Sequence, residues 1–193
     1  METIMSKPCC LNRTTELYLA AFNRILQKMI CKMSNAKLTN SISHNFIVQM
    51  IPHHQAAIEM SENILKYTSN NSVENIASNI ITEQTKSIEN MLSIEKSCNC
   101  LVNQRQELQL YQTKINQVMQ TMFSNMSKAC CTNQINCNFM WEMIPHHEGA
   151  VLMSEITLQF NICPELKPIL DSIISSQKKG ISEMQNLLHC LEC

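Results

Sequence analysis

The chain contains one segment twice, and this duplication restricts its fold more than any other feature. NFIVQMIPHHQAAIEMSENIL begins at Asn45, and NFMWEMIPHHEGAVLMSEITL begins 93 residues later at Asn138. The same offset relates positions along nearly the whole chain, and no linker-like composition interrupts it. We therefore predict two copies of one structural unit, residues 8–100 and residues 101–193, packed as one globular domain.

Each unit is predicted to consist of three helices. Apolar residues recur at three- and four-residue steps in three segments of each copy, and no segment alternates with period two over a useful length. The second segment runs from about Ser43 to Tyr67, and the last one begins at Pro164, where proline suits a first helical turn. Amphipathic helices bury their apolar faces against one another. The sequence thus predicts an all-α, up-and-down helical bundle built from two tandem three-helix repeats.

Composition and charge narrow the functional classes. The chain has 15 Lys and Arg against 16 Asp and Glu, so its formal net charge is -1. Nucleic-acid binding is disfavoured because it requires a basic surface. No apolar run reaches the roughly 18 to 20 residues of a membrane span, and the N-terminal residues lack the apolar core of a signal peptide. We expect a cytoplasmic protein with neither a nucleic acid nor a membrane as its partner.

The motif MIPHH stands in the middle of an apolar stripe in both copies. At about 100° per residue, Met50 and His54 share one helix face, while His53 and Met60 lie together on its flank. Two imidazoles and two thioethers therefore converge on about a third of the helix surface. The second copy repeats the arrangement with Met143, His146, His147 and Met153.

Two further polar features accompany the motif. Pro52 and Pro145 precede the histidines, and we expect each helix to continue through its proline with a kink rather than begin there. Gln84 and Gln177 lie in the apolar stripe of the third helix of each unit. A buried amide needs partners, so we expect each Gln to face an imidazole across a polar pocket.

The ligand chemistry favours a soft metal ion. Imidazole suits zinc, copper, iron or nickel, whereas thioether sulfur selects soft ions such as Cu(I). We therefore expect Cu(I), with Ag(I) as its mimic, and keep zinc and iron as alternatives. In the competing interpretation, the histidines are ordinary core residues paired with Gln and with backbone carbonyls.

The 11 cysteines raise a separate question. In a reducing compartment they favour free thiols or metal ligands over a disulfide framework. If the helices alternate in direction, one end of the bundle holds Cys31, Cys98, Cys100, Cys163 and His44. The other end then holds Cys9, Cys10, Cys130, Cys131, Cys137, His189, Cys190 and Cys193. The candidate thiol ligands are Cys98, Cys100, Cys130, Cys131, Cys137, Cys190 and Cys193.

The segments FIVQMIPHHQAAIEMS and FMWEMIPHHEGAVLMS, each followed by a helix with Q, I and M, resemble the family called "domain of unknown function 305". The resemblance implies a ferritin-like, all-helical fold and, through CopM-type members, copper binding. It implies as ligands His53, His54, Met50, Met60, His146, His147, Met143 and Met153. The family's second motif matches Gln84, Met91, Gln177 and Met184. Its acidic residue is replaced by Ser87 in one copy and by Gly180 in the other.

We predict a non-enzymatic protein that binds Cu(I) or Ag(I) for intracellular copper sequestration or handling, alone, as a homo-oligomer or with a metal-transfer partner. A ferritin-like metalloenzyme with a carboxylate and histidine centre is the alternative from another class. It would need an inward-pointing carboxylate from among Glu59, Glu62, Glu83 and Glu155. A metal-free helical interaction protein is the third hypothesis.

Overall fold

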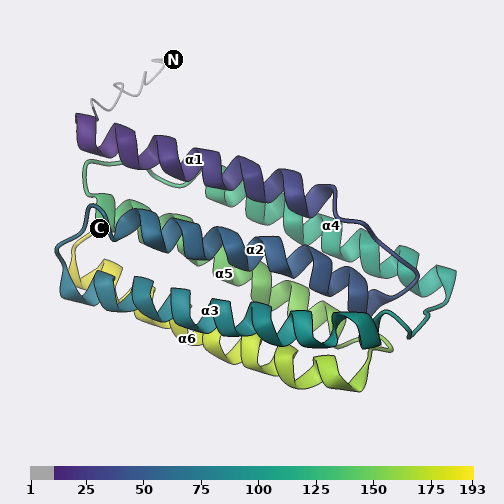
Figure 1. Cartoon of the computed structure of the whole chain (residues 1–193). Helices are drawn as coiled ribbons and strands as arrows, with labels where there is room; N and C mark the ends of the chain where they lie inside the picture. Colours follow the sequence, from purple (N-terminus) through teal and green to yellow (C-terminus); the bar gives the residue numbers. More distant parts are fainter. Residues whose placement is uncertain (1–10) are drawn as a thin grey trace, which may run out of the picture.

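The chain forms a bundle of long helices (Figure 1). The computed structural model describes residues 11–193, and the predictions for Cys9 and Cys10 lie outside this range. Its elements are α1 (Arg13–Ser34), α2 (Ile42–Ile64), α3 (Asn71–Cys98), α4 (Arg105–Ser127), α5 (Ile135–Thr157), the short 3-10 helix η1 (Pro164–Leu166) and α6 (Lys167–Cys190). No strand occurs in residues 11–193, so the all-α prediction is confirmed.

The helices form three layers of two, and successive helices run in opposite directions (Figure 1). Helix α2 packs between α1 and α3, and α5 packs between α4 and α6. The two units meet through α2 against α5, α3 against α6 and, more lightly, α1 against α4. Helices α2 and α5 are therefore the central pair, and they carry the two MIPHH motifs. None of the helices in the described part of the chain is long and apolar enough to cross a membrane.

Helix boundaries follow the internal repeat. Helix α5 begins and ends 93 residues after α2, although their N-caps differ. Both helices contain their proline, Pro52 in α2 and Pro145 in α5, so neither helix begins there, as expected. Helix α2 ends at Ile64, slightly before the predicted end, because the next residues form tight turns such as Tyr67 N–H to the Ile64 carbonyl.

Polar residues begin four of the helices by accepting the first backbone N–H groups. Asn12 accepts from Thr15, Ser41 from His44, and Asn70 from Ser72 and Val73. Gln104 and Glu107 form a reciprocal capping box at the start of α4. Such caps satisfy N–H groups that have no partner within the helix, and they define where each helix starts.

Methionine fills much of the core. The buried methionines are Met29, Met33, Met50, Met60, Met91, Met119, Met122, Met126, Met140, Met143, Met153 and Met184. An unbranched thioether adapts to irregular gaps in a core that has few rings. Met122 shows this adaptation, because its side chain occupies the space that a Cβ atom at Gly149 would need.

Candidate functional site

The two central helices meet at a pair of histidines. His53 Nε2 lies 3.2 Å from the backbone oxygen of His146, and His146 Nε2 lies 3.1 Å from the backbone oxygen of His53. Their ring centroids are 3.7 Å apart, at an interplanar angle of 32°. The repeat thus places equivalent residues of the two copies in direct reciprocal contact.

These hydrogen bonds determine which ring nitrogen carries the proton. A backbone carbonyl can only accept, so Nε2 donates in both His53 and His146, and Nδ1 is left with a lone pair. Both Nδ1 atoms are buried and have no hydrogen-bond partner. Burial lowers the pKa of His146 to about 4 and holds the pKa of His53 well below its usual value. Both imidazoles are therefore neutral at pH 7, and each has a free lone pair.

His54 and His147 extend this pair into a row of four rings. The centroid of His54 lies 5.8 Å from that of His53, and the centroid of His147 lies 5.9 Å from that of His146. Burial lowers the pKa of His54 to about 3, and burial followed by the nearby His146 holds the pKa of His147 well below its usual range. All four motif histidines thus lie uncharged in the centre of the bundle.

The outer two histidines differ in their surroundings. Ser87 Oγ lies 3.1 Å from Nε2 of His54. The repeat-equivalent residue, Gly180, offers no hydroxyl to His147, and a Cβ atom there would approach Nε2 of that ring to 3.2 Å. The two positions where the chain departs from the family motif are therefore those that contact the outer histidines.

The predicted thioether ligands are all buried. Met50, Met60, Met143 and Met153 lie on α2 and α5, the same helices as the histidines. Met91 and Met184 are fully buried on the flanking helices α3 and α6. Their role as ligands stays a prediction, and the fold buries all six in the core.

Gln84 shares a groove with His54, as expected, but it makes no hydrogen bond to a histidine, so that part of the prediction is wrong. Neither Nε2 nor Oε1 of Gln84 has a hydrogen-bond partner, and Oε1 of Gln177 has none either. His54 Nε2 contacts the hydroxyl of Ser87 instead, which lies about one helical turn beyond Gln84 on α3. The unpartnered amides instead line a groove of about 440 Å³ between α3 and α6, together with His54 and Ser87.

The carboxylates required by the metalloenzyme hypothesis do not join the histidines. Glu59 pairs with Lys28 at 2.6 Å, and Glu155 pairs with Lys178 at 2.7 Å. Glu62 is exposed, and so is Glu83 at the rim of the groove. In the part of the chain that the structure describes, no three His, Cys, Asp or Glu ligand atoms that include a motif histidine come within 4.8 Å of one another.

The sequence reasoning missed one buried carboxyl group, Glu142 on α5. It accepts a hydrogen bond of 2.6 Å from Tyr18 Oη on α1. Burial raises the pKa of Glu142 to about 8, although the Tyr18 hydrogen bond works in the opposite direction. The signal in the sequence was its position in the apolar stripe, where the first copy has the equally buried Gln49.

Within residues 11–193, the cysteines gather at the two ends of the bundle, as alternating helices require. The preference for free thiols over disulfides is wrong for four of them, however: Cys98 is joined to Cys163, and Cys137 to Cys193. Folding brings these pairs to Cα–Cα distances of 5.3 and 5.8 Å, which suit a disulfide, although each pair is far apart in the sequence. Three of the candidate thiol ligands, Cys98, Cys137 and Cys193, are therefore available only after reduction. The other four, Cys100, Cys130, Cys131 and Cys190, are exposed.

Known structures share this architecture. A crystal structure of a DUF305 fragment from Deinococcus radiodurans is 20% identical, with a TM-score of 0.56, and the match covers 80% of this chain and 97% of that one. CopM in the Ag-bound form, obtained by soaking, is 25% identical, with a TM-score of 0.57 and coverage of 78% and 97%. The Ag-bound form of CopM obtained by co-crystallization is also 25% identical, with a TM-score of 0.55 and coverage of 76% and 95%.

Sequence comparison gives the family. No curated protein matches the chain. The family model described as "Domain of unknown function (DUF305)" matches residues 43–188, which include both MIPHH motifs and both motif glutamines. The chain therefore belongs to the DUF305 family.

Proposed function

We propose that this protein binds Cu(I), with Ag(I) as its chemical mimic, in the buried layer between α2 and α5, and that it stores the ion or passes it on. The observation that carries the proposal is the histidine pair. His53 and His146 are buried and neutral, and each keeps an Nδ1 lone pair that no protein group uses. A neutral imidazole nitrogen with an unused lone pair can coordinate a metal ion.

The charge of the site favours a monovalent ion. The proposed ligands are neutral imidazoles and neutral thioethers, so nothing in this set offsets the charge of a divalent ion. Burying an uncompensated charge is costly, and the cost rises steeply with the charge. Thioether sulfur also prefers soft Cu(I) to zinc or iron.

The comparisons support the choice of metal. Two solved structures of CopM in the Ag-bound form align with about three quarters of this chain. Ag(I) is a soft monovalent ion like Cu(I), so an Ag-binding relative is consistent with histidine and methionine ligands. The same class of cargo is proposed for this chain.

The groove between α3 and α6 provides a route for exchange. It is lined by His54, the outermost ring of the row on α2, and by the unpartnered amides of Gln84 and Gln177. An ion that enters there would meet polar groups before it reaches the central pair. Release to a transfer partner would proceed by stepwise ligand exchange, so the proposed role is non-enzymatic.

Anaerobic titration tests the proposal. Protein with its disulfides intact and its free thiols alkylated is titrated with Cu(I), Zn(II) and Fe(II) in competition with a chromophoric chelator. The test variant is His53→Ala, His54→Ala, His146→Ala and His147→Ala together. The matched control replaces the two histidines outside the row, His44→Ala and His189→Ala.

We expect Cu(I) to bind more tightly than Zn(II) or Fe(II), the fourfold variant to lose at least about tenfold in Cu(I) affinity, and the control to bind as the wild type does. Circular dichroism checks that both variants remain helical. Unchanged Cu(I) affinity in a helical fourfold variant would refute the site. Tighter binding of Zn(II) or Fe(II) would refute the soft-metal assignment.

A further inference from the structure

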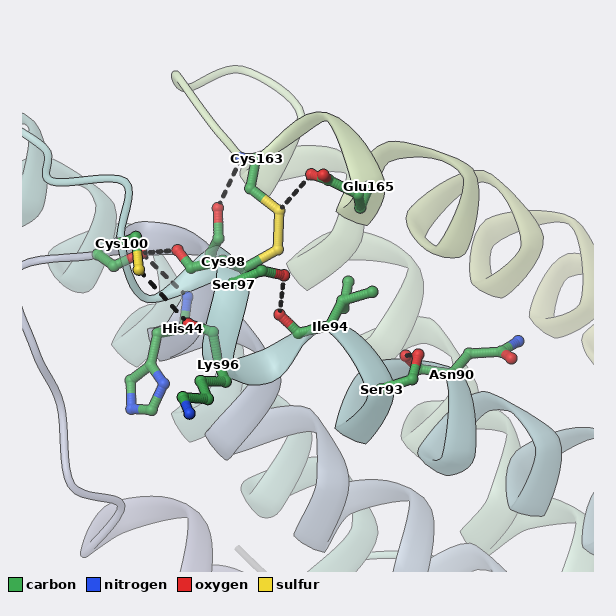
Figure 2. Close-up of a disulfide and its surroundings, with 12 residues drawn as sticks. His44, Asn90, Ser93, Ile94, Lys96, Ser97, Cys98, Cys100, Cys163 and Glu165 are labelled. Atoms are coloured by element: carbon green, nitrogen blue, oxygen red, sulfur yellow. Dashed lines mark hydrogen bonds between the residues drawn. A yellow bond between two sulfur atoms is a disulfide. The ribbon is translucent and has the colours of Figure 1, made fainter.

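A second group of potential ligands lies at the end of the bundle where α3 ends and α6 begins. Cys98, the last residue of α3, is joined to Cys163, which directly precedes η1 (Figure 2). Both cysteines are buried, and Oε2 of Glu165 lies 3.2 Å from Sγ of Cys163. Within residues 11–193, this is the only group of three His, Cys, Asp or Glu ligand atoms closer than 4.8 Å to one another.

The position of Glu165 suits the reduced state of this pair. A disulfide sulfur carries no hydrogen, so in the oxidised protein the Cys163 sulfur cannot donate to the carboxylate. After reduction, the Cys163 thiol can donate its S–H to Glu165 Oε2, which already lies beside it in the oxidised protein. The Glu165 carboxylate is therefore already beside the sulfur that becomes a thiol when the disulfide is reduced.

Hydrogen bonds between two serine side chains and the cysteine backbones hold both cysteines in place independently of the disulfide. Ser41 Oγ donates to the carbonyl of Cys98 at 2.9 Å, and the backbone N–H of Cys163 donates to Ser43 Oγ at 2.9 Å. Both serines stand at the start of α2, so one short segment fixes both cysteines. Breaking the sulfur–sulfur bond thus leaves two adjacent thiols in a preorganised position.

The other disulfide lacks these features. Cys193 is exposed and lies in the turn after α6, where its N–H bonds to the Leu188 carbonyl of the preceding helix. The oxygen near the Cys137 sulfur, at 2.9 Å, belongs to the neutral amide of Gln134 rather than to a carboxylate. Reduction would therefore produce two buried thiols beside a carboxylate at one end of the bundle, but a pair with one exposed thiol and no adjacent carboxylate at the other.

We propose that the Cys98–Cys163 disulfide is a redox-controlled metal site, which binds one Cu(I) ion after reduction through its two sulfurs, with the Glu165 carboxylate beside them. A dithiol reductant supplies two electrons and two protons, the sulfur–sulfur bond becomes two thiols, and the reductant becomes a disulfide. Cu(I) then displaces both thiol protons and forms two sulfur–copper bonds, a step in which no electron is transferred. Thiolate sulfur is a preferred ligand of Cu(I).

This site is independent of the proposed histidine site, so the two are tested separately. The experiment uses protein with Cys137→Ser and Cys193→Ser, so that only the Cys98–Cys163 disulfide remains. Cu(I) stoichiometry is measured by chelator competition in the oxidised protein and again after anaerobic reduction by dithiothreitol and its removal. The free thiols are alkylated while the disulfide is intact, so binding in the oxidised protein reports on the histidine row and the increase on reduction reports on Cys98 and Cys163.

We expect reduction to add one equivalent of Cu(I), with a thiolate-to-copper charge-transfer band in the ultraviolet. Cys98→Ser and Cys163→Ser should each abolish that added equivalent, whereas Cys100→Ser, at the exposed neighbouring thiol, should retain it. An equivalent that survives either of the first two substitutions, or is lost in the third, would overturn the assignment.

Alkylation mapping provides a readout that needs no substitution at Cys98 or Cys163. In the reduced protein, Cu(I) should protect Cys98 and Cys163 from iodoacetamide at least about tenfold more than it protects the exposed Cys31. Mass spectrometry of the digested protein measures this ratio. Equal protection of all three thiols would show adventitious copper binding and refute the site.

Discussion

His53 and His146 each donate a hydrogen bond from Nε2 to the other's backbone carbonyl, at 3.2 and 3.1 Å. Each residue is thus both donor and acceptor in the same pair, and the contact joins the central helices of the two units. The arrangement fixes both rings in one tautomer and leaves both Nδ1 lone pairs unused. A structural role and a ligand role therefore use different atoms of the same side chains, so they can be separated by substitution.

Replacing both histidines by Gln should separate these roles. A Gln side chain can still donate an N–H to the opposite carbonyl, but it lacks the Nδ1 lone pair. We expect His53→Gln with His146→Gln to lose at least about tenfold in Cu(I) affinity while the free energy of unfolding falls only slightly. Replacement of both by Ala should cost about 1 kcal/mol for each of the two hydrogen bonds lost. Urea denaturation and Cu(I) competition measure the two effects, and wild-type Cu(I) affinity in the Gln variant would contradict the assignment of Nδ1 as ligand.

Stability should fall as the pH is lowered below about 6.5. The unfolded chain takes up protons on its histidines near that pH, whereas the folded protein holds the pKa of His54 at about 3 and that of His146 at about 4. Each histidine therefore contributes up to about 1.4 kcal/mol per pH unit between these limits. Urea denaturation from pH 7 to pH 5 should show a steeper loss in the wild type than in a variant with all four motif histidines replaced by Gln. Equal slopes in the wild type and in the Gln variant would contradict the uncharged, buried state of these histidines.

Glu142→Gln should stabilise the protein at alkaline pH. The folded state keeps the Glu142 proton up to about pH 8, whereas the unfolded chain releases it near 4.5, so stability falls as the pH rises between these values. The amide of Gln cannot ionise and can still accept from Tyr18. We expect the variant to gain stability over the wild type from pH 5 to pH 8, by up to about 1.4 kcal/mol per pH unit. The reverse substitution, Gln49→Glu, should destabilise the protein over the same interval, and a Glu142→Gln variant with the wild-type pH profile would contradict the buried carboxyl.

Ser87→Ala should affect the two outer histidines unequally. It removes the hydroxyl that contacts His54 Nε2, a hydrogen bond worth about 1 kcal/mol of unfolding free energy. Imidazole nitrogen resonances in NMR spectra should shift for His54 but not for His147, which faces Gly180 instead. Ser172→Ala, on the opposite wall of the groove, is the matched control. Equal shifts for both histidines, or equal destabilisation by both substitutions, would contradict the Ser87 contact.

The periodicity of the sequence was sufficient to predict the helices and much of the core. Steps of three and four residues predict helices because side chains at that spacing share one helix face, and the offset of 93 then relates one unit to the other. Burial of the motif residues Met50 and His54 followed from the same stripe. The grouping of Cys98 with Cys163 at one end followed from alternating helix directions alone.

The contacts between helices were decided only by the tertiary structure. Whether His54 meets Gln84 or Ser87 depends on a displacement of one helical turn between packed helices, which periodicity cannot specify. The Tyr18–Glu142 hydrogen bond and the Cys98–Cys163 disulfide join residues far apart in the sequence, and their geometry depends on how the two units pack. The sequence by itself determined which side chains enter the core, because amphipathicity is a property of each helix. Only the tertiary structure decided which buried polar atoms find partners and which, like Nδ1 of His53, remain without one.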